Sequence, residues 1–429
     1  MTQPGIKNKI IPSGLTVKEV LTAIIDSVNV LPSEDVKLTE ALGRVLGGDI
    51  YSGFDIPHLD NSAMDGYAVK ASDTQGASQE NPKILEVIED LRAGYLASGN
   101  IKGNQAIRIM TGAPVPRGAD SIVMVENTEK SENNGVKIFE QASLGEHIRR
   151  QGEDIKKGEL VISKGTLLDS AHIGVLAGLG ISSLKVTRKP KVAILATGDE
   201  VIDVGEKLEP GKLYSSNSYS LYSQVIKCGG LPKNLGIAKD NAQELEAKIK
   251  EGLNCDLILT SGGVSVGDYD LVKDSLIKIG TDIKFWKVMM KPGKPLVFGT
   301  INGAVVFGLP GNPVSSMVSF EIFVRSAILK LLGQEDGKTR EVEALLDEEI
   351  KKKKKGLRYF LRAQTKWKNG VYITRTTGPQ GSGILKSMTL ANSLIILPEE
   401  AELVEKGTKV KVRFLDQSFS KKRGGDTFF

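Results

Sequence analysis

Residues that could bind an anion follow one apolar segment near the middle of the chain. The run CDLILTSGG leads into a loop with three glycines and two acids, Thr260-Ser-Gly-Gly-Val-Ser-Val-Gly-Asp-Tyr-Asp270. Glycines let a ligand approach backbone N–H groups, and the dipole of a following helix favours negative charge. The loop is therefore predicted to bind a phosphate or another oxyanion through residues Ser261, Gly262, Gly263, Ser265 and Gly267.

Asp268 and Asp270 stand where the next helix is predicted to begin. Their carboxylates could cap that helix or hold a divalent cation between protein and phosphate. Capping is the favoured interpretation of a single aspartate. Three glycines together with two acids at the carboxyl end of a strand favour a ligand site instead.

Two further loops follow predicted strands at the corresponding strand ends. Ala196-Thr-Gly-Asp-Glu200 could direct Asp199 or Glu200 into the same crevice, and a simple turn is the alternative. Leu309-Pro-Gly-Asn-Pro-Val-Ser315 opens another helix. Its residues Pro310, Gly311 and Asn312 are predicted to border the same pocket, where backbone donors at a helix start favour anions.

A lysine-rich turn, Trp286-Lys-Val-Met-Met-Lys-Pro-Gly-Lys-Pro295, lies between these loops. It sets Lys287, Lys291 and Lys294 around two prolines, and three ammonium groups so placed could hold an anion. A solvated surface turn is the alternative. The flanking prolines favour a binding function, because a flexible surface loop seldom needs them.

Polar side chains also gather in three irregular segments of the first half of the chain. Phe54-Asp-Ile-Pro-His-Leu-Asp-Asn-Ser-Ala-Met-Asp-Gly-Tyr67 holds three aspartates, RIMTGAPVPRGAD contains Thr111, and Arg149-Arg-Gln-Gly-Glu-Asp154 adds two more acids. Asx turns explain some of these residues, and a surface loop is the alternative for each segment.

The elements that must position these residues fall into several predicted units. Apolar residues recur at helical spacing from Thr16 to Val30, and helical periodicity returns from Ser170 to Leu184, which could pack on the first helix. Between about Asp49 and Asp154, short apolar segments broken by Gly, Pro, Asn and Asp predict a mostly β insertion. The helices would then form one discontinuous domain.

Three strand, loop and helix units begin at Lys189 and predict a parallel α/β sheet. Their helices are expected over Ser218–Lys227, Tyr269–Ile279 and Pro313–Leu332. After GQEDGKTR, segments such as LRYFLRAQTKW and TKVKVRFL alternate at period two, which predicts a small all-β C-terminal domain.

Bulk properties exclude several classes of protein. A net charge of +5 over 429 residues does not indicate a nucleic-acid-binding protein, and the five lysines at 351–355 lack interleaved aromatic residues. Two cysteines and three histidines cannot build a familiar zinc cluster. No apolar run is long enough to span a bilayer, and no signal peptide is evident at the start. A cytoplasmic protein with reduced thiols is predicted.

Seven segments taken together resemble the molybdopterin molybdenumtransferase family, which includes bacterial enzymes and the catalytic domain of gephyrin. They are DNSAMDGYAV, RIMTGAPVP, RRQGEDI, ATGDE, TSGGVSVGDYD, KPGKP and LPGNPVSS, in the order of the family and over nearly the whole chain. Each segment alone would be a weak signal, whereas the ordered set is highly specific.

The resemblance implies an elongated α/β multi-domain fold and a homodimer with its active site at the subunit interface. It implies a discontinuous helical domain at 12–48 and 155–187, a β-rich insertion at 49–154, a three-layer α/β domain at 188–335 and a C-terminal β barrel at 340–416. The α/β domain would be like that of the related pterin adenylyltransferases, and residues 417–429 would form a tail.

The resemblance also implies functional positions. Asp60, Thr111, Asp154, Glu200 and Asp270 would be catalytic, with Asp270 and Glu200 as metal ligands. Lys287 and Lys291 would bind an anion, to which the residue pattern adds Lys294, and Arg362 with Ser382 would contribute from the C-terminal domain.

The reaction implied is the insertion of molybdate into adenylated molybdopterin with magnesium, giving molybdenum cofactor and AMP. A molybdopterin adenylyltransferase would act upstream, and molybdoenzymes or cofactor carriers would receive the product. Nucleic acid and membrane are not expected partners. The alternatives are a molybdopterin adenylyltransferase and a non-catalytic pterin-binding scaffold. The residues do not distinguish molybdate from tungstate.

Overall fold

The computed structural model describes residues 14–263, 271–334 and 341–415. The chain divides into two compact units. We call Asp35–Val186 the inserted unit, and we call the part formed by Met1–Glu34 and Thr187–Phe429 the body. None of the described helices has the length and apolar character that a membrane span requires.

A six-stranded sheet forms the centre of the body. Its order is β16-β13-β17-β21-β20-β18, and the first four strands run parallel to one another. The strands are β13 (Lys191–Thr197), β16 (Leu231–Ala238), β17 (Leu257–Ser261), β18 (Asp282–Lys287), β20 (Pro295–Ile301) and β21 (Ala304–Leu309).

The predicted parallel sheet needs one correction, because β20 runs antiparallel to both of its neighbours. The cause is a two-residue hairpin between β20 and β21. Asn302 and Gly303 both take positive φ, of 48° and 84°, as the tightest hairpin turns require. The Asn-Gly pair was the signal in the sequence for this reversal.

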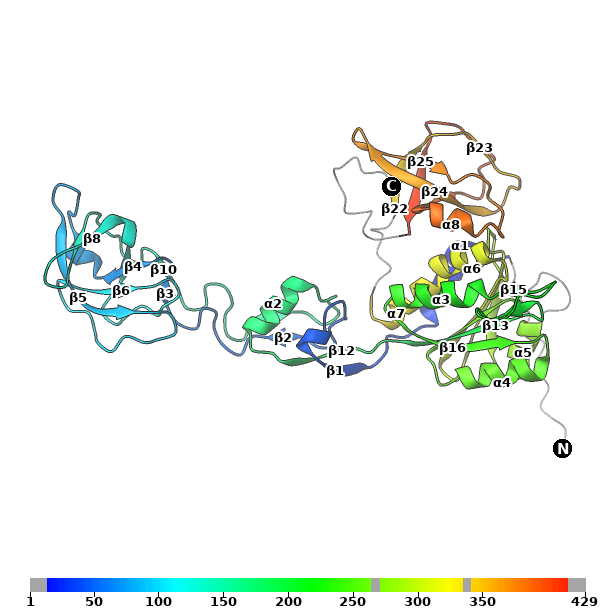
Figure 1. Ribbon diagram of the computed structural model, residues 1–429, viewed down its shortest axis with the longest axis horizontal. Helices are drawn as coiled ribbons and strands as arrows, with labels where there is room; N and C mark the ends of the chain where they lie inside the picture. Colours follow the sequence, from blue (N-terminus) through cyan, green and yellow to red (C-terminus); the bar gives the residue numbers. More distant parts are fainter. Residues whose placement is uncertain (1–13, 264–270, 335–340, 416–429) are drawn as a thin grey trace. The chain divides into compact units, whose positions relative to one another are not determined.

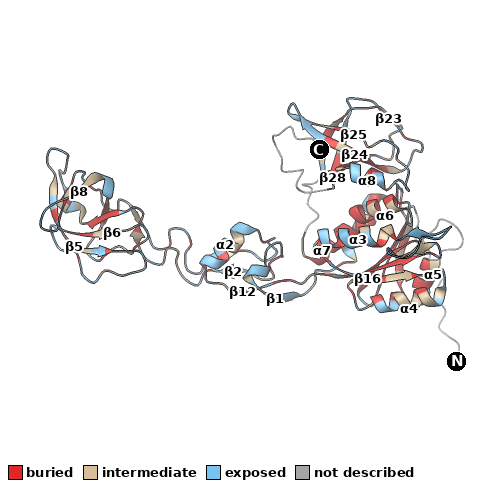
Figure 2. Ribbon diagram, viewed as in Figure 1, coloured by how far each residue is buried: buried red, intermediate tan, exposed pale blue. Residues whose placement is uncertain are grey.

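Helices cover both faces of the sheet (Figure 1). One face and its helices share a core that includes Leu221, Val318 and Ile328, and the other face packs against Leu245, Ile249 and Leu276. The first group of helices is α1 (Val17–Asp26), α3 (Ser216–Lys227), α6 (Pro313–Ser319), the π-helix η4 (Phe320–Val324) and α7 (Arg325–Leu331). The second group is α4 (Ala242–Gly252) and α5 (Leu271–Lys278). The short strands β14 (Val201–Ile202) and β15 (Leu213–Tyr214) pair beside the sheet. The sheet is buried between these layers (Figure 2).

The N-terminal helix α1 does not pack where the periodicity suggested. Its buried residues Val17, Val20 and Ile24 lie in the core of the body, against η4 and α7, rather than on the segment 170–184. Periodicity identifies the apolar face of a helix but not the surface that covers it. The start was readable, because Thr16 and Glu19 form a capping box in which Glu19 N donates to Thr16 Oγ1 at 3.3 Å and Thr16 N donates to Glu19 Oε2 at 2.8 Å.

The C-terminal part of the body is a closed five-stranded barrel. Strands β24, β25, β22, β28 and β26 follow one another, and the pairing of β24 with β26 closes the ring. Phe360 and Leu394 of the barrel also belong to the core beneath the α/β sheet. The elements of this region are β19 (Met290–Lys291), β22 (Glu341–Leu346), β23 (Ile350–Lys351), β24 (Arg358–Lys368), β25 (Val371–Thr376), α8 (Lys386–Leu390), β26 (Ser393–Leu397), β27 (Leu403–Val404) and β28 (Lys409–Phe414).

The inserted unit has a six-stranded sheet of order β7-β4-β6-β5-β9-β8, with apolar cores on both faces. A further apolar core lies around Leu46, Leu176 and Val186. The region predicted to be helical contains α2 but is otherwise built from short strands. The elements are β1 (Ser33–Lys37), η1 (Leu38–Glu40), β2 (Ile50–Tyr51), β3 (Asn61–Ser62), β4 (Gly66–Val69), η2 (Ala71–Thr74), β5 (Lys83–Leu91), β6 (Gln105–Ile109), β7 (Ser121–Met124), η3 (Val125–Asn127), β8 (Thr128–Lys130), β9 (Gly135–Ile138), β10 (Ile148–Arg149), β11 (Leu160–Ile162), α2 (Ser170–Gly178) and β12 (Ser183–Thr187).

Candidate active site

A cavity of about 730 Å³ lies where β13, β17 and β21 end. These strands are parallel neighbours, so the loops that follow them meet at one edge of the sheet. The barrel contributes Gly383 and Leu385 to the wall. The predicted loops contribute Ala196, Thr197, Glu200, Ser261, Gly262, Gly263, Gly311, Asn312 and Pro313 to the lining.

The glycines after β17 are required by packing. Gly262 and Gly263 take φ of 99° and 65°, a region that side chains rarely adopt. A Cβ on Gly262 would lie 2.6 Å from the carbonyl oxygen of Thr197, and one on Gly263 would lie 2.6 Å from Cγ2 of Val272. Gly262 N also donates to the carbonyl oxygen of Leu309 at 3.2 Å. The loop therefore fits against the ends of both neighbouring strands only with glycine at these positions.

The structure distinguishes the two acids that follow β13. Glu200 lines the cavity, and its carboxylate lies over Gly198, where a Cβ would come within 2.7 Å of Oε2. Asp199 is outside the lining, and its Oδ1 accepts a hydrogen bond from Asp240 N at 3.2 Å. Glu200 is therefore the acid that this loop offers to a ligand.

Four of the predicted loop positions, Ser265, Gly267, Asp268 and Asp270, lie outside the described residues. Among the residues that are described, no three His, Cys, Asp or Glu side chains are grouped closely enough to hold a metal ion. Of the predicted metal ligands, only Glu200 is therefore placed.

The lysine turn lies at the same edge of the sheet as the cavity, because β18 runs parallel to β21. Lys287, Lys291 and Lys294 are not among the residues that line the cavity. Lys287 Nζ lies 4.0 Å from the centroid of the Trp286 ring, and Lys291 Nζ lies 5.4 Å from that of Tyr359. The amines of these two lysines thus lie over aromatic rings.

In the inserted unit, Asp60 is held in its ionised form. Its Oδ1 accepts from Gln151 N, and its Oδ2 accepts from Arg150 Nη1, both at 2.7 Å. The backbone hydrogen bond from Gln151 is the main reason that the pKa of Asp60 lies below its ordinary value. Burial opposes this shift, and the hydrogen bond and charge of Arg150 add to it.

The other predicted residues of the inserted unit belong to the same group of loops. Thr111 donates from both its backbone N and its Oγ1 to Asp65 Oδ1, at 2.7 Å each. Asp154 N donates to the carbonyl oxygen of Ile56 at 3.0 Å. Pairing of β3 with β10 and a hydrogen bond from Val115 N to the carbonyl oxygen of Asp60, at 2.8 Å, join the three segments.

Arg362 does not reach the cavity. Its side chain is fully buried in the barrel and donates to Ser387 Oγ at 3.0 Å and to the carbonyl oxygen of Gly381 at 2.9 Å, with weaker bonds to two neighbouring carbonyls. Burial lowers its pKa to about 10. Arg362 therefore shapes the loop that carries Ser382, whose carbonyl oxygen accepts from Val314 N of α6 at 3.1 Å.

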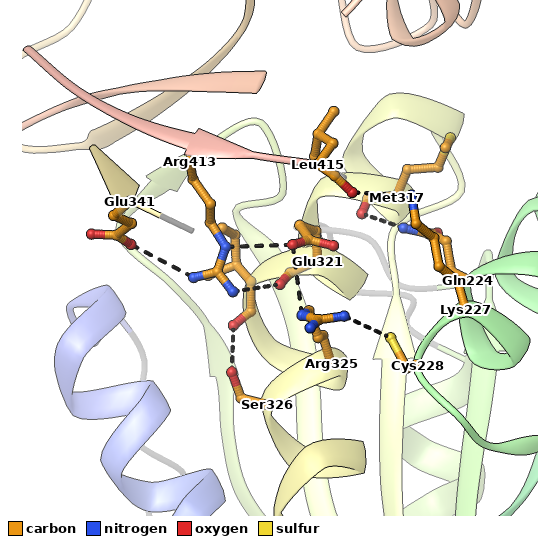
Figure 3. Close-up of polar contacts among 11 residues, drawn as sticks. Gln224, Lys227, Cys228, Met317, Glu321, Arg325, Ser326, Glu341, Arg413 and Leu415 are labelled. Carbon is orange, nitrogen blue, oxygen red and sulfur yellow. Dashed lines mark hydrogen bonds and ion pairs between the residues drawn. The ribbon is translucent and has the colours of Figure 1, made fainter. Parts of the chain in front are cut away.

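Buried ionic contacts hold the barrel on the α/β layer (Figure 3). Arg413 Nε of β28 lies 3.4 Å from Glu321 Oε1 of the π-helix η4, and Arg413 Nη1 lies 3.6 Å from Glu341 Oε1. Arg325 Nε lies 3.9 Å from the same Glu321 oxygen. Because the barrel supplies part of the cavity wall, these contacts help to fix that wall.

Comparison with known proteins gives consistent matches along the chain. Three family models match: the MoeA N-terminal region (domain I and II) over residues 15–180, a probable molybdopterin binding domain over 193–330, and the MoeA C-terminal region (domain IV) over 344–415. Molybdopterin molybdenumtransferase 2 of Mycobacterium tuberculosis is 40% identical over 88% of this chain and 94% of its own length. The enzyme of Bacillus subtilis named molybdopterin molybdenumtransferase is 38% identical over 89% of each chain.

The chain belongs to the molybdopterin molybdenumtransferase family. The fold agrees with this assignment. The crystal structure of the molybdopterin biosynthesis MoeA protein from Pyrococcus horikoshii OT3 has a TM-score of 0.78 and 33% identity, and the match covers 94% of this chain and 100% of that one.

In this member of the molybdenumtransferase family, the sequence alone indicated neither Asn217 nor Asp240, and both line the cavity. Thr197, which belongs to the predicted loop after β13, lines it as well. Asn217 Nδ2 donates to Ser261 Oγ and to the carbonyl oxygen of Gly311, both at 2.8 Å. No local pattern marks Asn217, because its partners lie more than 40 residues away along the chain.

Proposed function

We propose that this protein is a molybdopterin molybdenumtransferase that inserts molybdate into the dithiolene of adenylated molybdopterin and releases AMP. The observation that carries the proposal is the cavity at the carboxyl edge of the sheet, where the loops after β13, β17 and β21 each contain glycine. Such loops present backbone N–H groups to phosphate or another anion. Membership of the family supplies the class of substrate.

We propose that Glu200 provides one oxygen ligand for a magnesium ion, because hard divalent cations prefer carboxylate oxygens. Asp270 is proposed as the second carboxylate. When bound, magnesium would neutralise charge on the phosphoryl group. Molybdate, a dianion, is proposed to meet Lys287, Lys291 and Lys294 at the same sheet edge, and no covalent protein nucleophile is required.

The inserted unit is proposed to complete the site from a second subunit. Asp60, Thr111 and Asp154 would orient the substrate, so the active protein would be a homodimer. A molybdopterin adenylyltransferase would supply the substrate in the cytoplasm, and molybdoenzymes or cofactor carriers would take the product. Adenylyltransferase activity or pterin binding without turnover are the alternative functions, and the assay below separates them.

The test is AMP release from adenylated molybdopterin with molybdate and magnesium. Wild type should release AMP only with molybdate present, and Asp270→Asn and Glu200→Gln should slow release by about a hundredfold or more. Glu209→Gln, an exposed acid outside the cavity lining, should match wild type. Formation of the adenylate from ATP and free molybdopterin would favour an adenylyltransferase, and tight binding without release would favour a scaffold.

Mixing two inactive variants tests the shared site. Randomly mixed Asp60→Asn and Asp270→Asn subunits should recover about one quarter of wild-type activity, because half of the dimers are mixed and each of these has one intact site of two. No recovery would place both residues in the site of a single subunit.

A further inference from the structure

Two residues that line the cavity each carry a buried polar atom without a partner among the described residues. Thr197 is 3% exposed, and neither its Oγ1 nor Oδ1 of Asn217 has a hydrogen-bond partner in the described structure. Both residues line the cavity. The other buried side-chain atoms that lack a partner belong to residues outside this lining, such as Thr260 and Ser319.

The orientation of the Asn217 amide follows from its contacts. The carbonyl oxygen of Gly311 can only accept, so the side-chain atom 2.8 Å from it must be Nδ2. The same nitrogen donates to Ser261 Oγ at 2.8 Å. Both amide hydrogens are therefore used to join the loops after β17 and β21, and Oδ1 remains as a pure acceptor.

Buried polar atoms are nearly always paired, because leaving one unpaired costs roughly 1–3 kcal/mol. Two such atoms at one cavity can be explained by a bound ligand that completes their hydrogen bonds. Oδ1 repels phosphate and molybdate oxygens, which are also acceptors. The group that meets Asn217 must therefore donate, as a hydroxyl or a ring N–H does.

We propose that Asn217 and Thr197 bind the organic part of the substrate, with Asn217 Oδ1 accepting a hydrogen bond from a hydroxyl or N–H group. The inference rests on the proposed function for the class of substrate. The donor belongs either to the nucleotide, through its ribose hydroxyls or amino group, or to the pterin, through its ring N–H or amino group. Asn217 thereby has two functions, since the same amide also holds the two glycine loops together.

Thr197→Val gives the sharpest test, because it replaces the hydroxyl by a methyl group of nearly the same size. If the hydroxyl only fills space, its removal should leave both stability and binding unchanged or improved. If it binds ligand, the melting temperature should stay the same or rise while affinity falls about fivefold to tenfold. The affinity would then fall without a fall in melting temperature, and a hydroxyl with a purely structural role does not predict this result.

Calorimetric titration of the full-length protein should use AMP, molybdopterin and orthophosphate as separate probes. We expect Thr197→Val and Asn217→Ala to lose affinity for at least one organic probe and to keep that for orthophosphate. Loss for AMP assigns the donor to the nucleotide, and loss for molybdopterin assigns it to the pterin. Ser223→Ala is the matched control for Asn217, because Ser223 lies on the same helix, α3, and is exposed outside the cavity lining. This variant should bind like wild type.

Wild-type affinity of Thr197→Val for both organic probes would overturn the inference, as would an absence of binding by wild type. Asn217→Ala should also lower the melting temperature, because it removes two loop contacts; if that variant does not fold, Thr197→Val decides. These readouts need no turnover. One further outcome is that the variants lose affinity while the wild type binds the probes but releases no AMP in the turnover assay. That result would support the inference and would reject the proposed reaction.

Discussion

Single residues at the cavity show why glycine can be required for two different reasons. The sequence indicates Gly262 and Gly311 equally well, since both follow a strand and precede a helix. In the structure, Gly262 has a positive φ and touches the end of β13, whereas Gly311 has neither constraint. One is needed for the loop to form, and the other leaves room for a ligand.

This difference can be measured. Gly262→Ala should lower the free energy of unfolding by about 2 kcal/mol or more, because it combines a strained φ with a Cβ 2.6 Å from the carbonyl oxygen of Thr197. Gly311→Ala, whose Cβ would lie 3.5 Å from Cα of Gly262, should change it by less than about 1 kcal/mol. Denaturant titration of both variants is the measurement, and equal losses would contradict this account.

The sequence predicted the site residues that are recognised by their neighbours along the chain. The glycine loops and Glu200 are examples, since a strand end followed by glycine and acid is a local pattern. Arg362 is not, because the sequence does not show that its guanidinium is buried among backbone carbonyls. Asn217 is a further case, because only the folded sheet brings it to Ser261 and Gly311.

At the scale of elements, a half-buried ion pair lies at the start of β17. Arg188 Nη1 lies 2.7 Å from Asp256 Oδ2, which also accepts from Lys191 N at 2.8 Å. Burial raises the pKa of Asp256, but the hydrogen bonds and charge from Arg188 and Lys191 outweigh it and leave the pKa below the ordinary 3.8. The carboxylate therefore stabilises the folded state when it is ionised.

The sign of the pH dependence follows. A folded-state pKa below the unfolded value gives stability that is present above pH 3.8 and is lost as the pH falls through the folded pKa. The difference in unfolding free energy between wild type and Asp256→Asn should be constant at neutral pH and shrink in this acid range. Glu251→Gln, which breaks an exposed pair with Lys233, should cost less than about 1 kcal/mol at any pH. A difference that grows in acid would reverse the sign assigned to Asp256.

The barrel is held by a different kind of pair, because Arg413 and Glu321 are nearly buried. Arg413→Met should cost about 2–4 kcal/mol, since it leaves Glu321 without one of its cations, and Arg413→Met with Glu321→Gln should cost less. Affinity for AMP or molybdopterin should fall with Arg413→Met, because the barrel carries Gly383 and Leu385.

Arg358→Met is the control for that prediction. Arg358 pairs with Glu399 at 3.1 Å inside the barrel, so its loss should affect stability but not affinity. If both variants bind alike, the Arg413 contact does not position the cavity wall.

Elements with a strong local signal were predicted well, and those defined by their surroundings were not. The α/β units follow from strand ends, the β character of the C-terminal domain from alternation, and the presence of α1 from apolar residues at helical spacing. The packing of α1 on α7 and the antiparallel β20 depend on which surfaces meet in space. A periodic apolar face predicts that one side of a helix is buried, and it does not predict which element packs against that side.

For the whole molecule, the main feature is that the chain leaves the body and returns at adjacent points. The crossings are made by β1 and β12, which pair with each other. Arg188 N donates to the carbonyl oxygen of Pro32 at 3.0 Å, so the two ends are joined within the body itself. The inserted unit has cores of its own.

The two units should therefore be separable. A variant in which residues 35–186 are replaced by a short glycine-containing turn should remain folded and keep its affinity for AMP or molybdopterin. It should release no AMP, because the proposed acids Asp60 and Asp154 are missing. Circular dichroism, titration and the release assay would check these outcomes. Retained turnover would remove those acids from the mechanism, and a failure to fold would show that the body needs the inserted unit.

The hydrogen bond between Arg188 and Pro32 also bears on how such a chain could arise. It lies at the amino edge of the sheet, beside Asp256, whereas the cavity lies at the carboxyl edge. An ancestor with a plain turn at this point could have gained a whole domain in a single genetic event without disturbing its ligand. Binding would then be the older property of the lineage, and catalysis the later one.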